Sequence, residues 1–204
     1  MKRLVEFCLL FVLLPLAMLA APFRIPKLPL LLGAALVCGA LLLRDPAFDR
    51  RRLRWAAPSQ RFAKALALRI ALVSLLLAAG AGWFAPEAFM AFPRQRTGLW
   101  VLVVCLYPVL SVFPQELLYR AFFFHRYQAL FRGEQRMIWA SALSFAFLHI
   151  IFGNPVAPLL TVPGGYLFAR TYARTGSLPA VVIEHAVYGN LVFTVGLGMY
   201  FYNG

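Results

Sequence analysis

The stretch GLWVLVVCLYPVLSVFPQELLYRAFFFH, residues 98–125, decides the fold class. It is longer than the roughly 20 apolar residues that a helix needs to cross the hydrocarbon of a bilayer. Glu116 and Arg120 nevertheless lie inside it, although a charge at membrane depth costs at least about 3 kcal/mol. The stretch therefore predicts a membrane helix that carries functional polar groups.

The rest of the chain extends this prediction. Of the 204 residues, 62% are hydrophobic and 13% are charged, and the mean hydropathy is +0.77. A soluble domain of this length cannot hide so much apolar surface. We predict an all-α polytopic membrane helical bundle with about 7–8 transmembrane helices, at residues 4–21, 28–43, 63–85, 98–125, 137–152, 156–172 and 178–202. One membrane domain, 1–204, would comprise three N-terminal helices in 1–97 and a catalytic-type core in 98–204.

Prolines and glycines mark two interruptions. Pro108 and Pro114 lack a backbone donor, so we expect a break just before Gln115, which would raise the count to eight helices. The last segment contains Gly189, Gly196 and Gly198 and is expected to be interrupted or very closely packed.

The charge distribution indicates membrane lipids as partners and no nucleic acid. The net charge is +13, and the cations lie in the gaps between apolar runs, where they meet anionic headgroups. The loop at residues 44–64 is the most basic gap, so it and the N-terminus are expected in the cytoplasm. We expect an integral protein of the bacterial inner membrane.

Three polar clusters fall at related positions in this topology. The midpoint between Glu116 and His149 falls at about Gly133, where a turn is expected, and His185 lies eleven residues after Arg174, about 16 Å along its helix. The three side chains are predicted to share one depth and one polar cavity, open towards the cytoplasm. Glutamate and imidazole together can activate a water molecule.

Each cluster also has a structural interpretation. Glu116 and Arg120, four residues apart, could simply form an ion pair on one helix face. His149 could be a buried core histidine beside Phe145. Asn190 could be an amide that packs helices together, and Glu184 a residue at the membrane boundary.

Three motifs together resemble the CAAX-protease and bacteriocin-processing (Abi) family of intramembrane proteases. They are QELLYR (115–120), FAFLH (145–149) and HAVYGN (185–190), in the family's order. The resemblance covers residues 98 onward. It implies a membrane protease with Glu116, His149, His185, Asn190 and Arg120 as catalytic residues, supported by Gln115, Phe145 and Glu184.

Two positions depart from the family pattern Glu-Glu-x-x-x-Arg and His-x-x-x-Asn. Gln115 replaces the first glutamate, and an amide cannot accept a proton, so Glu116 is expected to act as the base. Gly189 stands four residues after His185, and Asn190 is displaced by one position, about 100° around the helix.

Several alternatives remain open at this stage. We favour a site without a cofactor, because Arg120 competes with a cation for Glu116, although Glu116, His149 and His185 could bind zinc. A catalytically inactive scaffold and a small proton-coupled transporter are the other functional hypotheses. The resemblance allows CAAX-like, leader or bacteriocin-type substrates attached to the membrane.

Overall fold

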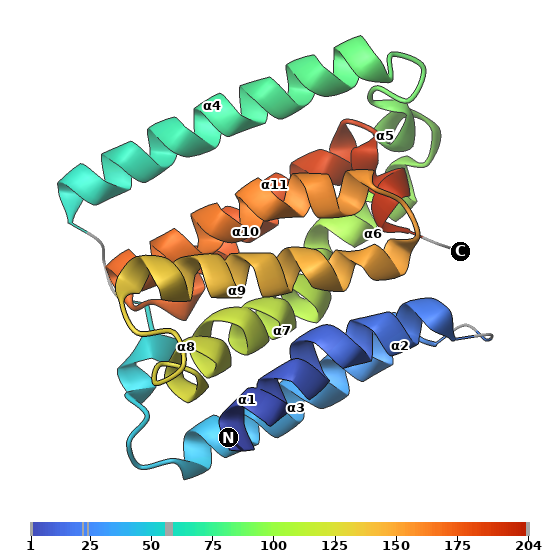
Figure 1. Cartoon of the computed structure of the whole chain (residues 1–204). Helices are drawn as coiled ribbons and strands as arrows, with labels where there is room; N and C mark the ends of the chain where they lie inside the picture. The colour runs from blue at the N-terminus through green and yellow to red at the C-terminus, as the bar shows by residue number, and fades with distance from the viewer. Residues whose placement is uncertain (1, 22, 24, 56–58, 203–204) are drawn as a thin grey trace.

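The computed structural model describes residues 2–21, 23, 25–55 and 59–202. Within these ranges the chain is a bundle of helices without strands (Figure 1), which confirms the all-α prediction. The α-helices are α1 (Lys2–Cys8), α2 (Leu14–Ala20), α3 (Lys27–Arg44), α4 (Gln60–Phe84), α5 (Ala91–Gln95), α6 (Thr97–Tyr107), α7 (Phe113–Glu116), α8 (Phe123–Arg126), α9 (Glu134–Leu148), α10 (Val156–Thr175) and α11 (Leu178–Thr194).

Several of these elements join into longer helices. Five helices in the part of the chain described here are long and apolar enough to cross a membrane, namely Lys2–Ala20, Lys27–Arg44, Gln60–Phe84, Thr97–Arg126 and Glu134–Phe152. With α10 and α11 they fall on the predicted segments to within a few residues, except at the end of the last segment. The protein is therefore an integral membrane helical bundle.

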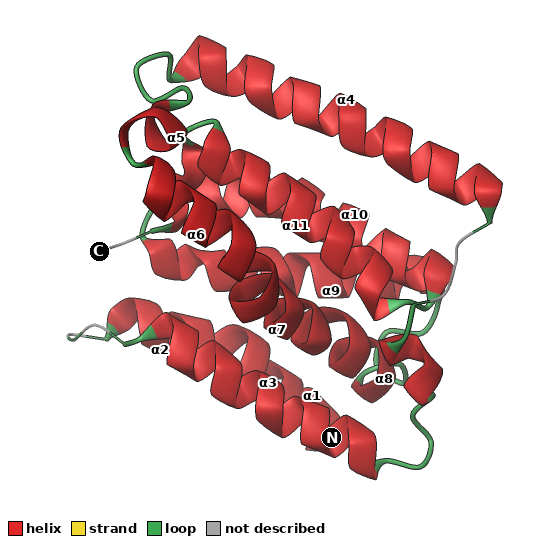
Figure 2. Ribbon diagram, turned by 180° about the vertical axis from the view of Figure 1, so that it is seen from behind, coloured by secondary structure: helices red, strands yellow, loops and turns green. Residues whose placement is uncertain are grey.

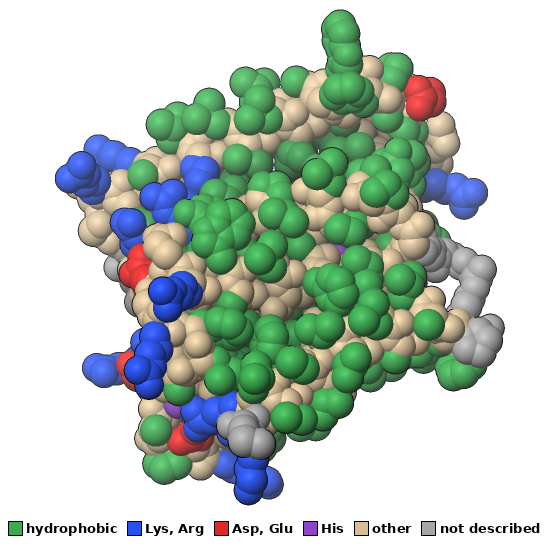
Figure 3. Space-filling view, in the orientation of Figure 1, with side chains coloured by type: hydrophobic (Ala, Val, Ile, Leu, Met, Phe, Trp, Pro, Cys, Tyr) green, Lys and Arg blue, Asp and Glu red, His purple; other side chains and the backbone are tan. Residues whose placement is uncertain are grey.

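The outer surface of α4 is strongly apolar. Leu68, Leu75 and Leu76 are 61%, 66% and 71% exposed, and Trp83 and Phe84 near its end are more exposed still. Such large apolar patches are compatible with lipid but not with water. Figure 3 shows hydrophobic side chains along the flank of the molecule and a concentration of Lys and Arg at one end.

The helix with the two prolines differs from the prediction. The expected break before Gln115 is wrong, because the chain stays helical from Thr97 to Arg126. Two π-helical turns, Pro108–Val112 and Leu117–Phe122, lie within it. A widened turn changes the hydrogen-bonding pattern without interrupting the helix, and π-helical turns are frequent at functional sites.

The predicted helix at residues 178–202 ends earlier than expected, at Thr194. Gly196 has a φ of 95°, and a Cβ there would overlap the Ala88 carbonyl group. Only glycine adopts this conformation without strain. The chain turns here and continues as a 3₁₀ helix, Leu197–Phe201.

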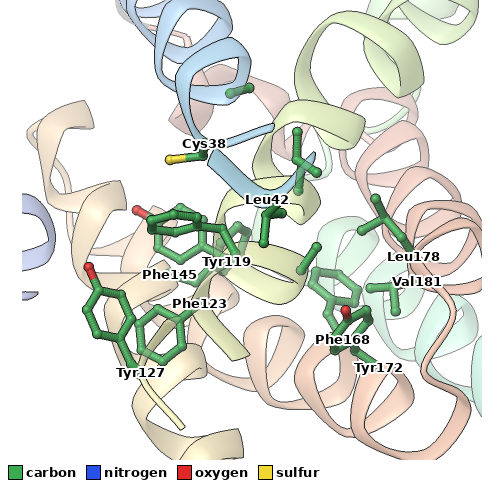
Figure 4. Packing of buried hydrophobic residues seen from close by; sticks show 14 of the residues in the cluster. Cys38, Leu42, Tyr119, Phe123, Tyr127, Phe145, Phe168, Tyr172, Leu178 and Val181 are labelled. Carbon is green, nitrogen blue, oxygen red and sulfur yellow. The ribbon is translucent and has the colours of Figure 1, made fainter. Parts of the chain in front are cut away.

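The core lies where α3, α7–α8, α9, α10 and α11 meet (Figure 4). Aromatic rings dominate it, with Tyr119 edge-on to Phe145 at 5.3 Å between ring centroids. α9 and α10 pack especially closely, because a Cβ on Gly165 would lie 3.0 Å from the Ala142 carbonyl oxygen. This contact fixes α9 and α10 against each other, and both helices carry residues of the cavity described below.

The basic end gives a prediction about topology. We expect a cysteine introduced at Arg52 to be labelled from the cytoplasm and one at Gln95 from the other side, because both positions are exposed and lie beyond opposite ends of α4. A membrane-impermeant maleimide applied to intact cells and to inverted vesicles makes the measurement, in a background that lacks the three native cysteines. Labelling of position 52 in intact cells would reverse the orientation. Residues 56–58 of this predicted loop lie outside the described residues.

Candidate active site

Glu116 is buried between a histidine and an arginine. Its Oε1 lies 2.7 Å from Nδ1 of His185, and its Oε2 lies 3.0 Å from Nε of Arg120. Neither Glu116 nor Arg120 is exposed at all. The Arg120 contact is an ion pair without hydrogen-bond alignment, since neither atom has a hydrogen-bond partner. The predicted pair on one helix face is therefore present, and it extends to α11 through His185.

Arg120 is part of the packed core. Its Nη1 donates to Ser141 Oγ at 2.8 Å and to the Tyr119 carbonyl oxygen at 3.3 Å. Its guanidinium group also lies 5.0 Å from the ring centroid of Phe145. Cation–π contact is attractive when both groups are desolvated. Arg120 thus joins α9 to the π-helical turn after Glu116 and holds the carboxylate in place.

His185 is fixed on several sides. Its ring stacks on Phe168 at 4.4 Å between centroids and meets Phe145 edge-on at 5.6 Å. Because the Glu116 carboxylate accepts the hydrogen bond, Nδ1 carries the proton and Nε2 has the lone pair. The hydroxyl group of Tyr107 lies 3.3 Å from that Nε2.

His149 has the same tautomer for a different reason. It begins the 3₁₀ turn after α9, and its Nδ1 lies 2.7 Å from the carbonyl oxygen of Phe145. A carbonyl oxygen can only accept, so Nδ1 donates and Nε2 again has the lone pair. The sequence pair of Phe145 and His149 is thus linked through backbone as well as ring contact.

Both histidines line one cavity of about 440 Å³. This is a typical volume for a small-molecule or peptide site. Its wall is mainly apolar and includes residues of α4, α10 and α11, together with Tyr107, Ser111 and Gln115. One lining residue, Leu76 on α4, is 71% exposed, so the cavity reaches the flank of the bundle.

The cavity differs from the prediction in two ways. Glu116 does not line it and lies behind His185. His149 is 15 residues from the start of α9, whereas Glu116 is ten residues from the end of α8, a difference in depth of about 7 Å. Phe152 and Phe201, which also line the cavity, follow α9 and α11 at the end away from the basic loops. The lining thus includes residues at the end away from the basic loops, and the opening towards the cytoplasm stays a prediction.

Gln115 faces the cavity that Glu116 does not reach. Its Nε2 donates to Ser111 Oγ at 2.7 Å, one turn earlier on the same helix. This hydrogen bond fixes the amide orientation and leaves its carbonyl oxygen available to accept from a ligand.

Two other predicted residues point elsewhere. Glu184 is fully buried, but its carboxylate lies 2.7 Å from Arg69 on α4 and accepts from Thr171 at 2.6 Å. The Nδ2 of Asn190 donates to the Val104 carbonyl oxygen at 3.2 Å. Neither residue lines the cavity. Their contacts join α11 to α4, α10 and α6.

The zinc alternative does not fit the donors as they are arranged. Among the residues described, no group of three or more His, Cys, Asp or Glu side chains is placed to hold a metal ion. The Glu116 carboxylate is already in contact with His185 on one oxygen and with Arg120 on the other. Zinc requires several free donors in a tetrahedral arrangement, and both Glu116 oxygens are already in contact with other side chains, so a site without a cofactor remains our expectation.

Sequence reasoning missed three residues near the site. Phe168 and Tyr107 contact His185, but neither differs in type from the many aromatic residues around it. Arg69 had a visible signal, since it is a cation inside the apolar segment 63–85. Its ion pair with Glu184 holds α4, one wall of the cavity, against the bundle.

Comparison with known proteins gives one family. The model described as type II CAAX prenyl endopeptidase Rce1-like matches residues 97–191. This range begins with α6 and ends within α11, so it includes all three sequence motifs. Comparison with curated proteins and with solved structures gives no significant match.

Proposed function

We propose that the protein hydrolyses peptide bonds of membrane-associated substrates inside the bilayer, because the model of Rce1-like type II CAAX prenyl endopeptidases matches its residues 97–191. The observation that carries this proposal is the pair of imidazoles at one cavity. Each has its Nδ1 hydrogen-bonded to an acceptor, so Nε2 is the acceptor atom of each ring, and in His185 it lies 3.3 Å from the hydroxyl group of Tyr107.

Water activation follows from this arrangement. His185 Nε2 takes a proton from water while the hydroxide attacks the scissile carbonyl carbon, and the imidazolium then gives that proton to the departing amine nitrogen. Glu116 balances the positive charge that forms on His185 and keeps the ring oriented, as the carboxylate does in a Ser-His-Asp triad. Glu116 is thus a positioning residue, and His185 rather than Glu116 is the base.

His149 and Gln115 supply the other polar groups of the cavity. His149 Nε2 can accept a hydrogen bond from the attacking water and hold it near the carbonyl carbon. Gln115 has a carbonyl oxygen free to accept from a substrate amide group. The remaining wall is apolar and reaches the lipid-facing flank beside Leu76, which suits an apolar or lipid-bearing CAAX-type peptide.

A cleavage assay tests this proposal. Protein reconstituted in liposomes is expected to release the C-terminal tripeptide from a farnesylated CAAX peptide without an added metal. His149→Ala should lower kcat by about a hundredfold or more, because general acid–base groups typically contribute at least that much. Matched liposomes without protein give the background, and no release above it from wild-type protein would count against peptidase function.

An inactive scaffold is the second candidate. The residue that lines the cavity at position 115 is an amide, which cannot accept a proton, whereas the family pattern has a glutamate there. In the scaffold case, Gln115→Glu would create cleavage that the parent lacks, since the new carboxylate could accept a proton beside His149. If the parent is active, the same variant should change the pH profile instead, because a second buried acid near Glu116 makes ionisation of one of them harder.

A further inference from the structure

Gly189 leaves room for a tyrosine from another helix. It lies four residues after His185 on α11, and therefore on nearly the same face. A Cβ built on Gly189 would overlap both the ring and the hydroxyl group of Tyr107. The two positions belong to α11 and α6, which lie side by side (Figure 2). The missing side chain at position 189 is what admits the phenol.

Tyr107 is held firmly in this position. Its ring meets Phe193 edge-on at 5.2 Å between centroids. The α6–α11 contact is also fixed by two hydrogen bonds, from Trp100 Nε1 to Thr194 Oγ1 at 3.0 Å and from Asn190 Nδ2 to the Val104 carbonyl oxygen at 3.2 Å. The first π-helical turn begins at the next residue, Pro108. The hydroxyl group is thus preorganised rather than free to move with a loose side chain.

The hydroxyl group of Tyr107 donates to His185. It lies 3.3 Å from Nε2, and Nε2 can only accept while Nδ1 donates to Glu116. Tyr107, His185 and Gly189 all line the cavity. A donor therefore sits at the place where a substrate carbonyl group would meet the proposed base.

We infer that Tyr107 is the hydrogen-bond donor that stabilises the oxyanion of the tetrahedral intermediate, which deepens the proposed function and rests on it. Nε2 has a single lone pair, so the attacking water must take the place of the Tyr107 hydroxyl group before Nε2 can take its proton. The displaced O–H then turns to the substrate carbonyl oxygen, where negative charge develops during the attack. Tyr107 keeps its proton throughout, so the step involves only an exchange of acceptors.

Asn190 cannot fill this role in its present position. Its Nδ2 is bonded to the backbone of α6, and its side chain does not line the cavity. Preorganised donors aimed at developing charge are worth about 10²–10³ in kcat. In this protein the donor is Tyr107 on α6 instead of a side chain on α11, so the contribution to kcat is kept although Gly189 has no side chain.

Tyr107→Phe tests the inference, because it removes only the hydroxyl group. In the farnesylated-peptide assay we expect kcat to fall by about a hundredfold, with KM changed by less than about threefold. Tyr166→Phe is the matched control, since this α10 tyrosine packs against Trp139 and does not line the cavity. Unchanged kcat in Tyr107→Phe, with active wild-type protein, would overturn the inference and leave the peptidase proposal intact.

A second pair of measurements does not depend on turnover. A peptide phosphonate has a tetrahedral phosphorus with anionic oxygens and so imitates the intermediate. Calorimetry should show that it binds Tyr107→Phe at least about tenfold more weakly than wild type, because a hydrogen bond to a charged acceptor is lost. Equal affinity would overturn the inference even if wild-type protein proves inactive. Gly189→Asn should bind the phosphonate poorly because its side chain displaces Tyr107, and the double variant Tyr107→Ala/Gly189→Asn should recover affinity by supplying a donor from α11. Failure of this double variant to exceed Gly189→Asn would count against a donor exchange between the two positions.

Discussion

Glu116→Gln is expected to lower kcat by about 10³–10⁴-fold, which is the cost of replacing the carboxylate of a catalytic triad with an amide. Glu116 Oε1 fixes the ring of His185 at 2.7 Å and selects the tautomer with a lone pair on Nε2. An amide can present its NH₂ group to the ring, which favours the opposite tautomer and removes the base. It also cannot balance the charge of an imidazolium. The measurement is kcat in the farnesylated-peptide assay, normalised to folded, monodisperse protein.

Glu184→Gln is the matched control for this loss. Glu184 is also fully buried and paired with an arginine, and it precedes His185 directly in the chain. Its carboxylate faces Arg69 and Thr171, so the substitution should weaken the attachment of α4 and reduce kcat far less. Comparable losses in the two variants would mean that Glu116 acts only as a counter-charge for Arg120.

Arg120→Leu is expected to destabilise the folded protein by about 3–5 kcal/mol, because it leaves a buried carboxylate without its partner. Arg120 is fully buried and also bonds Ser141 and the Tyr119 carbonyl group, so hydrogen bonds are lost as well. The double variant Arg120→Leu/Glu116→Gln should regain much of the stability, since neither charge remains, while activity stays low. Thermal unfolding in detergent, followed by size-exclusion chromatography, measures the stability of the single and the double variant, and the farnesylated-peptide assay measures their activity.

Arg126→Leu is the comparison for Arg120. Arg126 also forms a close ion pair, at 2.6 Å from Glu6, but the two side chains are 39% and 29% exposed. Partly exposed pairs contribute little, about 0–1 kcal/mol. A loss in Arg126→Leu equal to that in Arg120→Leu would show that burial is not what makes the inner pair important.

The helical bundle could be predicted because the length of each apolar segment can be read from the sequence. The choice between Gln115 and Glu116 could not, because consecutive residues differ by about 100° around a helix and the π-helical turn at Leu117–Phe122 changes the spacing of faces. The prediction of equal depth for Glu116 and His149 counts residues 127–133 as if they were helical. These residues connect α8 to α9 and add no length to either helix, so the count is misleading. The same error applies to His185, which is only seven residues into α11 because the helices part at Gly176 and Ser177.

Tyr107 shows a different limit of sequence reasoning. It meets His185 across 78 residues of chain, and no periodicity relates the two positions. The empty place at Gly189 was visible as a departure from the family pattern, but what fills it depends on how α6 and α11 pack. Contacts between distant helices require the tertiary structure.

The two inner ion pairs, Glu116–Arg120 and Arg69–Glu184, have different consequences for how the protein is assembled in the membrane. Glu116 and Arg120 lie on one helix, so Thr97–Arg126 enters the bilayer with its charges already neutralised by a neighbour one turn away. Arg69 and Glu184 lie on α4 and α11, more than a hundred residues apart, and each remains uncompensated in lipid until the two helices meet. Since an isolated charge inside a bilayer is unfavourable, we expect their encounter to draw α4 against α11. On this expectation, the cavity wall formed by α4 is added only after α11 has been synthesised.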